Sequence, residues 1–224
     1  MEEARVSESL STLFLRLNGF FTTGLILHSS KKGTVAGEID CFAVRFPNRI
    51  PKTDYSIEDS GLLNISNKLT DLVFCEVKSS KPSFNKSLEN FRNIEQSLYW
   101  AGVHTKKEIE AVAPKFADLL KNKDYSKLSQ DGVVCGNVRV RALLLCPKCA
   151  KRGDNDLYIN GADIMKYIHD SLIKSGRPDN CNRNYNSEIW GTEFSNIVAW
   201  FKGRPEGEAP KFKDLCAALI KNGS

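Results

Sequence analysis

Three charged residues in two short strings have the types and spacing that hydrolytic chemistry needs. The strings are Gly37-Glu38-Ile39-Asp40 and Phe74-Cys75-Glu76-Val77-Lys78. Side chains alternate between the two faces of a strand, so Glu76 and Lys78 should point to the same side. If the two strings form neighbouring strands, Asp40 and Glu76 meet on one polar surface beside Lys78. Two carboxylates that hold a divalent cation, with an ammonium nearby, suit hydrolysis of a phosphodiester.

Each residue has an expected role in such a site. Asp40 and Glu76 would hold Mg²⁺, which usually takes one or two protein carboxylates, and Mn²⁺ could substitute for it. The backbone carbonyl of Val77 would be a third ligand. Lys78 would hold the attacking water or stabilise charge on the phosphate. Because charged pairs are common on exposed strand faces, the alternative is a solvated Glu76–Lys78 pair without a catalytic role.

Hydrophobic periodicity, caps and turn residues predict the elements that position these strings. We expect residues 1–150 to form an α/β core with a mixed central sheet flanked by helices. Residues 151–224 should form a mostly helical extension packed on that core, and 47–70 should be a connection with one helical turn. The predicted helices cover 3–18, 85–101, 105–120, 162–174, 191–202 and 210–221, and the predicted strands cover 20–28, 38–46, 71–78, 133–146 and 157–159.

In this order of elements, the two strings resemble the PD-(D/E)xK nuclease superfamily, in particular its Holliday-junction-resolvase-like branches. They are similar to the G-E-I-D and F-V-E-V-K strings of those branches. The resemblance covers roughly residues 3–146 and implies a restriction-endonuclease-like core that runs helix, three strands, helix, strand. It also implies a Mg²⁺-dependent endonuclease that cuts DNA, in defence against foreign DNA or in repair.

The resemblance extends to a residue in the first helix. In those branches an acidic residue precedes a Gly-aromatic pair by about eleven positions, as Glu8 precedes Gly19-Phe20 here. The resemblance implies that Glu8 contributes to the metal site and the catalysis through a water molecule held by the metal. Glu8 also lies opposite the apolar stripe of its helix, so the alternative is a solvated side chain.

A looser similarity concerns the helix that follows the third strand. Gln96 begins a glutamine-and-aromatic string, Gln96-Ser97-Leu98-Tyr99-Trp100, that some branches use near the scissile strand. Arg92 lies one helical turn before Gln96, so the two side chains could meet a phosphate or a base edge. The alternative is a polar helix surface with Tyr99 or Trp100 in the core. One departure from the family pattern is the long gap between Asp40 and Glu76, which leaves the substrate and partner open.

Composition excludes several other classes of protein. The chain has 224 residues and a net charge of +5, which permits nucleic-acid binding without requiring it. No apolar run is long enough for a membrane span, no secretory signal is recognisable, and no phosphate-binding glycine loop occurs. We therefore expect a cytoplasmic protein. The resemblance implies that its partner is nucleic acid, DNA before RNA. Rival functions are a ribonuclease on the same fold and a non-catalytic protein that binds nucleic acid or a partner subunit, and a homodimer is open.

The seven cysteines are read as reduced thiols and not as a disulfide framework. Cys146 and Cys149 have the spacing of half a structural zinc site. Completing it would require two more ligands, such as Cys181 and His169. Because no second pair stands at a fixed spacing, paired reduced thiols in a turn are favoured over Zn²⁺.

Overall fold

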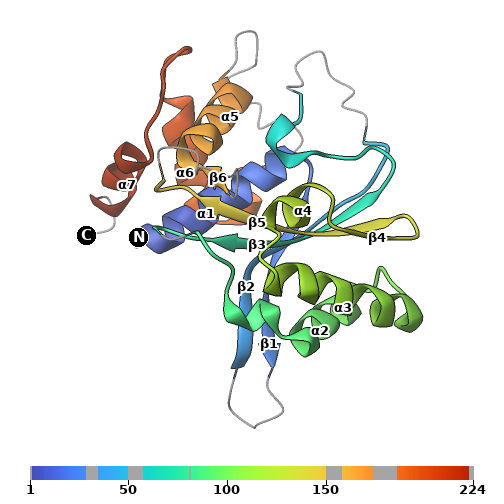
Figure 1. Ribbon diagram of the computed structural model, residues 1–224. Helices are drawn as coiled ribbons and strands as arrows, with labels where there is room; N and C mark the ends of the chain where they lie inside the picture. Colours follow the sequence, from blue (N-terminus) through green and yellow to red (C-terminus); the bar gives the residue numbers. More distant parts are fainter. Residues whose placement is uncertain are drawn as a thin grey trace.

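A mixed sheet lies between two layers of helices in the computed structural model (Figure 1). The structure describes residues 2–28, 35–49, 58–80, 82–149, 158–173 and 186–221. Within these residues the sheet has six strands in the order β1-β2-β3-β5-β4, with β6 paired to β5. The strands are β1 (Phe21–His28), β2 (Val35–Arg45), β3 (Thr70–Val77), β4 (Val133–Cys135), β5 (Val138–Cys146) and β6 (Ile159–Asn160).

Strand β3 is the centre of this sheet. It pairs antiparallel with β2 and parallel with β5. Phe74 packs in one apolar cluster, while Cys75, its neighbour in sequence, packs in another on the opposite face. The predicted α/β class, the mixed sheet and the alternation within β3 are therefore confirmed.

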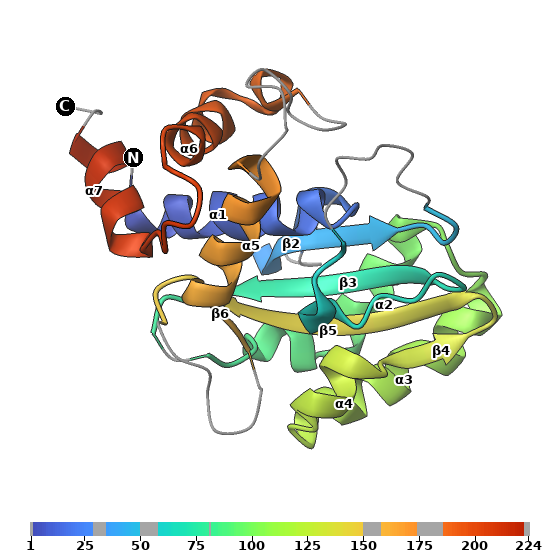
Figure 2. The same cartoon turned by 90° about the horizontal axis from the view of Figure 1, so that it is seen from above.

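The layer on the Cys75 face contains four helices and both ends of the described chain (Figure 2). Phe14 of the first helix and Phe201 near the C-terminus are both fully buried in the cluster that this layer shares with the sheet. The helices are α1 (Glu3–Leu17), α5 (Gly161–Ile173), α6 (Thr192–Lys202) and α7 (Phe212–Lys221).

The layer on the Phe74 face contains the other three helices. Phe116 stacks at 5.1 Å from the Phe74 ring, measured between centroids, and both side chains are fully buried. The helices are α2 (Phe91–Ala101), α3 (Lys106–Lys121) and α4 (Tyr125–Gln130). The capping box predicted at Thr105 and Glu108 is confirmed as the start of α3.

Two predicted elements are divided in the structure and one helix was missed, each because of local capping or turn chemistry. The helix expected over 85–101 is a 3₁₀ turn, η2 (Lys86–Glu89), followed by α2, because Asn90 accepts a hydrogen bond from the Arg92 N–H and starts a new helix. The strand expected over 133–146 is a hairpin, because Gly136 has φ +58° and reverses the chain. Helix α4 was not predicted, and the side chain of Asp124 caps it.

Two buried arginines bind the connection that precedes β3 through hydrogen bonds. Asp71 accepts hydrogen bonds from Arg139 and Arg141, and all three side chains are buried. Arg141 also donates to the carbonyl oxygen of Leu63, in the 3₁₀ turn η1 (Gly61–Leu63). In the described residues of this connection the expected helical turn is present as η1, and residues 50–57 lie outside the described part of the chain.

An arginine of α1 stacks on two aromatic rings of the C-terminal segment. The Arg16 guanidinium lies 4.6 Å from the centroid of Trp190, in the 3₁₀ turn η3 (Ser187–Trp190), and 4.7 Å from that of Phe194. Such stacking stabilises a cation against a ring face. The extension therefore shares a core with the rest of the chain.

The reading of all cysteines as reduced thiols is wrong for one pair. Cys146 and Cys149 form a disulfide in the turn after β5. Their spacing brings the two sulfurs together within one turn, and a disulfide leaves no thiolate for Zn²⁺. Cys41, Cys75, Cys135 and Cys216 are free, and Cys181 lies outside the described residues.

Candidate active site

The pairing of β2 with β3 brings the two predicted acids together. Cys41 pairs with Cys75, and Asp40 and Glu76 are the next residues beyond that pair on each strand. There the Asp40 carboxylate accepts a hydrogen bond of 2.7 Å from the backbone N–H of Val77. Asp40 is thus fixed against the same end of β3 that carries Glu76.

Glu76 is a fully buried carboxylate with one satisfied oxygen. Its Oε2 accepts a 2.8 Å hydrogen bond from Lys78 Nζ, whereas Oε1 is buried without a hydrogen-bond partner among the described residues. Burial raises the pKa of Glu76 to about 7; the hydrogen bond from Lys78 opposes this shift, and the charge of Asp40 adds to it. A buried oxygen without a partner costs free energy, so this carboxylate is suited to a cation or proton.

Lys78 lies immediately after β3, held by its backbone and its side chain. Its N–H donates to the carbonyl oxygen of Leu145 on β5 at 2.9 Å. Its ammonium reaches both Glu76 and Asn85, the latter at 2.7 Å. The side chain is 20% exposed, so the ammonium is ordered at the margin of the site.

Glu8 lies close enough to the site to interact with it electrostatically. Its pKa is raised by partial burial, then by the charges of Asp40 and Glu38. Glu38 also contributes to the raised pKa of Glu76. The Glu8 side chain is exposed, as the alternative of a solvated side chain expected, and the effect of Asp40 and Glu38 on its pKa is what links it to the site.

The donor set fits a cation held by two carboxylates. Within the described residues, no group of three or more His, Cys, Asp and Glu side chains is arranged to hold a metal ion. Glu8, Asp40 and Glu76 therefore do not converge as three ligands in this conformation. Mg²⁺ commonly takes one or two carboxylates and keeps several waters, so Asp40 and Glu76 remain a sufficient pair.

The predicted nucleic-acid contacts lie on a different element. Arg92 and Gln96 are both on the exposed face of α2. Tyr99 and Trp100 are also exposed, at 45% and 59%, so neither ring is in the core as the alternative had it. The contacts that build the acidic site come from other elements, and Arg92 and Gln96 are not among them.

Two residues of the site were missed from the sequence. Glu38 shares a strand face with Asp40, and this alternation could have nominated it. Asn85 had no such signal, because only the fold brings its amide to Lys78.

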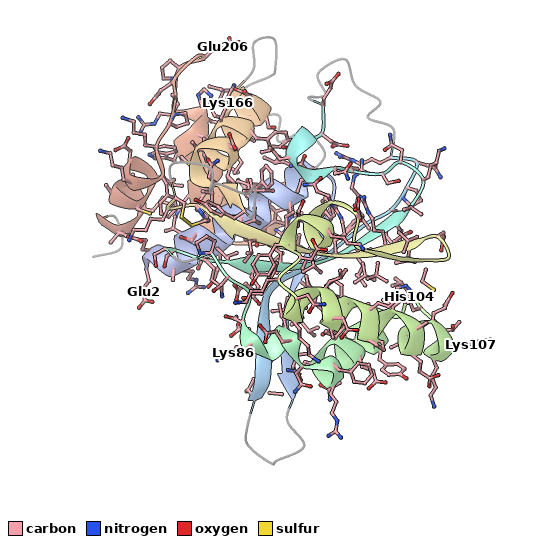
Figure 3. The ribbon with its side chains drawn as sticks, in the orientation of Figure 1. Glu2, Lys86, His104, Lys107, Lys166 and Glu206 are labelled. Carbon is pink, nitrogen blue, oxygen red and sulfur yellow. A yellow bond between two sulfur atoms is a disulfide. The ribbon has the colours of Figure 1, made fainter. Side chains whose placement is uncertain are left out.

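Glycine at position 37 is required by close packing. A Cβ on Gly37 would lie 2.7 Å from the Cβ of Ser87 in η2. In Figure 3, Lys86 of η2 and Lys107 of α3 lie at opposite ends of the layer formed by α2 and α3. Gly37 therefore lets η2 approach β2 next to the acids.

The chain has no match among protein-family models, curated proteins or solved structures. The family resemblance thus stays a prediction from the two strings. No helix in the described part of the chain has the length and hydropathy needed to cross a bilayer.

Proposed function

We propose that this chain is a Mg²⁺-dependent nuclease that hydrolyses phosphodiester bonds, with DNA as the favoured substrate. The observation that carries the proposal is Glu76: a fully buried carboxylate, next to Asp40 and Lys78, with one oxygen that has no hydrogen-bond partner in the described part of the chain. A solvated strand pair would leave the carboxylate in water, where it needs no partner. The assignment of the core to the restriction-endonuclease-like fold, and a role in defence or repair, are parts of the same proposal.

Each residue has a role in this proposal. Asp40 and Glu76 would hold the cation, together with the Val77 carbonyl, and Glu8 would assist from α1. When bound, Mg²⁺ would supply positive charge that offsets the charge of the phosphodiester. Lys78 would donate a hydrogen bond to a phosphate oxygen or to the attacking water, from an ammonium already held in place. Arg92 and Gln96 would meet the nucleic acid from the exposed face of α2.

The test is cleavage of supercoiled plasmid, linear duplex, single-stranded DNA and RNA with Mg²⁺, Mn²⁺ or a chelator. Removing a hydrogen-bond donor to a developing charge typically costs about 10² to 10³ in rate, so Lys78→Ala should lose at least that much. Asp40→Asn should also abolish most of the activity. Cleavage of RNA alone, dependent on a 2′-hydroxyl, would favour the ribonuclease.

Lys166 and Asp170 provide matched controls. They form an exposed ion pair on α5, and Figure 3 shows Lys166 on the other side of the sheet from Lys86. Lys166→Ala and Asp170→Asn should cut like the parent. The proposal fails if no substrate is cut with any cation, or if Lys78→Ala and Asp40→Asn cut as fast as these controls.

A further inference from the structure

The side-chain amide of Asn85 does not cap the helical turn that follows it and binds Lys78 instead. Asn85 is the residue before η2, where asparagine side chains commonly accept a hydrogen bond from the first turn of a helix. Here the side chain makes no such cap. Its Oδ1 instead accepts a 2.7 Å hydrogen bond from Lys78 Nζ. The backbone of Asn85 still closes the turn, because its carbonyl oxygen accepts from the Leu88 N–H at 2.9 Å.

The segment that carries Asn85 is fixed on both sides. Leu88 is fully buried in the cluster beneath α2 and α3. The carbonyl oxygen of Ser87 accepts from the Asn93 amide at 2.8 Å, and Gly37 allows β2 to approach Ser87 closely. The amide of Asn85 therefore acts from a rigid support, as a residue that orients another side chain must.

We propose that Asn85 is a positioning residue that keeps the Lys78 ammonium at the site, including when a divalent cation binds Glu76. This inference rests on the proposed function for its catalytic consequence. Lys78 donates to Glu76 and to Asn85, so two of its three N–H groups are engaged. A cation on Glu76 competes for that carboxylate and repels the ammonium. The neutral amide oxygen of Asn85 is not subject to that competition.

The chemistry of the amide fits this role better than a carboxylate would. Asparagine supplies an acceptor oxygen without a negative charge, so it holds an ammonium and competes little for the cation. With Asn85 in place, the third N–H of Lys78 remains directed by two fixed acceptors. The consequence is an ammonium that is oriented before substrate arrives, which spares the reaction the cost of ordering it.

The experiment measures hydrogen exchange of the Lys78 ammonium by NMR in protein with ¹⁵N-labelled lysine, with and without saturating Mg²⁺. The signal is assigned by its loss in Lys78→Arg. In the parent, exchange should stay slow in both conditions. In Asn85→Ala the exchange should be faster than in the parent without Mg²⁺. With Mg²⁺ it should be faster by about tenfold or more, since the loss of a hydrogen bond to a charged group changes an equilibrium by about tenfold or more. Asn85→Asp, which keeps an acceptor, should restore slow exchange in the absence of Mg²⁺.

The matched control is Asn90→Ala, the same substitution five residues later. Asn90 caps α2 through the Arg92 N–H, so its loss weakens the segment without removing a partner of Lys78. It should leave the exchange rate unchanged. The proposal is overturned if Asn85→Ala exchanges as slowly as the parent, or if Asn90→Ala exchanges as fast as Asn85→Ala.

Kinetics give a second readout. Asn85→Ala should lower kcat by about 10 to 100-fold with little change in KM, because the bound substrate meets a misplaced ammonium. Asn85→Asp should recover kcat only in part, because it keeps the acceptor while its charge competes for the cation, and a rise in KM alone would contradict the role. If Mg²⁺ leaves the parent spectrum unchanged and no substrate is cut, the proposed function fails. The cation-free exchange rates of the parent and Asn85→Ala still decide whether Asn85 positions Lys78.

Discussion

Glu76 departs furthest from the behaviour of an ordinary surface carboxylate. Its side chain is fully buried, and its nearest charged neighbours have opposite effects, Lys78 favouring ionisation and Asp40 opposing it. Because burial dominates, the pKa is raised to about 7. The residue can therefore change its charge near neutral pH, and this makes the stability of the protein depend on pH in a predictable direction.

The folded state should lose stability as pH rises from about 4.5 to about 7. The usual pKa of this carboxyl is 4.5 and the folded value is about 7, so the folded protein binds the proton more tightly than the unfolded chain. The favourable contribution is complete below the unfolded pKa and is lost as pH rises through the folded pKa. Urea unfolding at several pH values measures it.

Glu76→Gln is the control for that titration, because it removes the charge and retains the shape. Its unfolding free energy should fall less over the same interval. Mg²⁺ should reduce the loss in the parent, since a cation favours the ionised carboxylate. A pH dependence identical in the parent and in Glu76→Gln would contradict the assignment of the shift to Glu76.

At the scale of elements, strands were easier to predict than the turns between them. The alternation in 71–78 and the helical spacing in 3–18 identified β3 and α1 almost to the residue. The elements predicted over 85–101 and 133–146 are each divided in two. The cap at Asn90 and the left-handed Gly136 interrupt apolar patterns that are otherwise continuous. The acids of the site could be nominated since alternation within a strand is local.

The rest of the site could not be predicted, because it depends on contacts between distant segments. Asn85 meets Lys78 only once η2 packs on β2, and no periodicity encodes that contact. The Cys146–Cys149 disulfide required knowledge of the turn after β5. Asp40, Glu76 and Lys78 could thus be nominated from alternation along two short strings, whereas Asn85, on the connection to α2, could not.

Gly37→Ala should shift η2 and disturb the site. The added Cβ meets Ser87 at 2.7 Å, and overpacking of this kind costs about 1 to 3 kcal/mol. Cleavage should fall as well, since η2 follows directly on Asn85. Gly24→Ala on β1 is the matched control, because a Cβ there meets nothing within 4 Å and should cost less than about 0.5 kcal/mol.

Ser87→Gly provides the check on that explanation. In the Gly37→Ala background it removes the side chain that the new methyl group meets. Stability and cleavage should both recover in part. If the double variant is as defective as Gly37→Ala, the contact between β2 and η2 is not the cause.

Asp71→Ala should be the most destabilising single change considered. It leaves Arg139 and Arg141 buried without their carboxylate, and breaking a buried pair in this way costs about 3 to 5 kcal/mol. Thermal or urea unfolding measures it. Asp170→Ala removes an exposed i, i+4 pair and should cost less than about 1 kcal/mol. Equal losses in the two variants would show that the buried pair is no more important than the exposed one.

At the scale of the whole molecule, the C-terminal helices belong to the same core as the sheet. One apolar cluster contains residues from α1, β3, β5 and each of α5, α6 and α7. In Figure 1 the N- and C-terminal ends lie beside each other on the same side of the sheet. Removing the extension would expose the face of α1 that packs against it.

We therefore expect a single cooperative unfolding transition. Trp100 is exposed on α2, so Trp100→Phe should cost little and leaves Trp190 and Trp200 as fluorescent probes of the C-terminal half. In that variant, fluorescence and far-ultraviolet circular dichroism should give the same midpoint in urea. A fluorescence midpoint well below the dichroism midpoint would mean that the extension unfolds by itself.

The hydrogen bond from the Lys78 N–H to Leu145 has a consequence for the timing of protein synthesis. Strand β3 and Lys78, the residue after it, leave the ribosome long before β5, the parallel neighbour of β3, because chains emerge from the N-terminus. Until β5 arrives, β3 is an edge strand and the Lys78 N–H lacks its partner. A growing chain that already contains Asp40 and Glu76 therefore still lacks the strand that fixes the backbone of Lys78. The site is complete only after the segment through Cys146 has emerged and β5 has paired with β3.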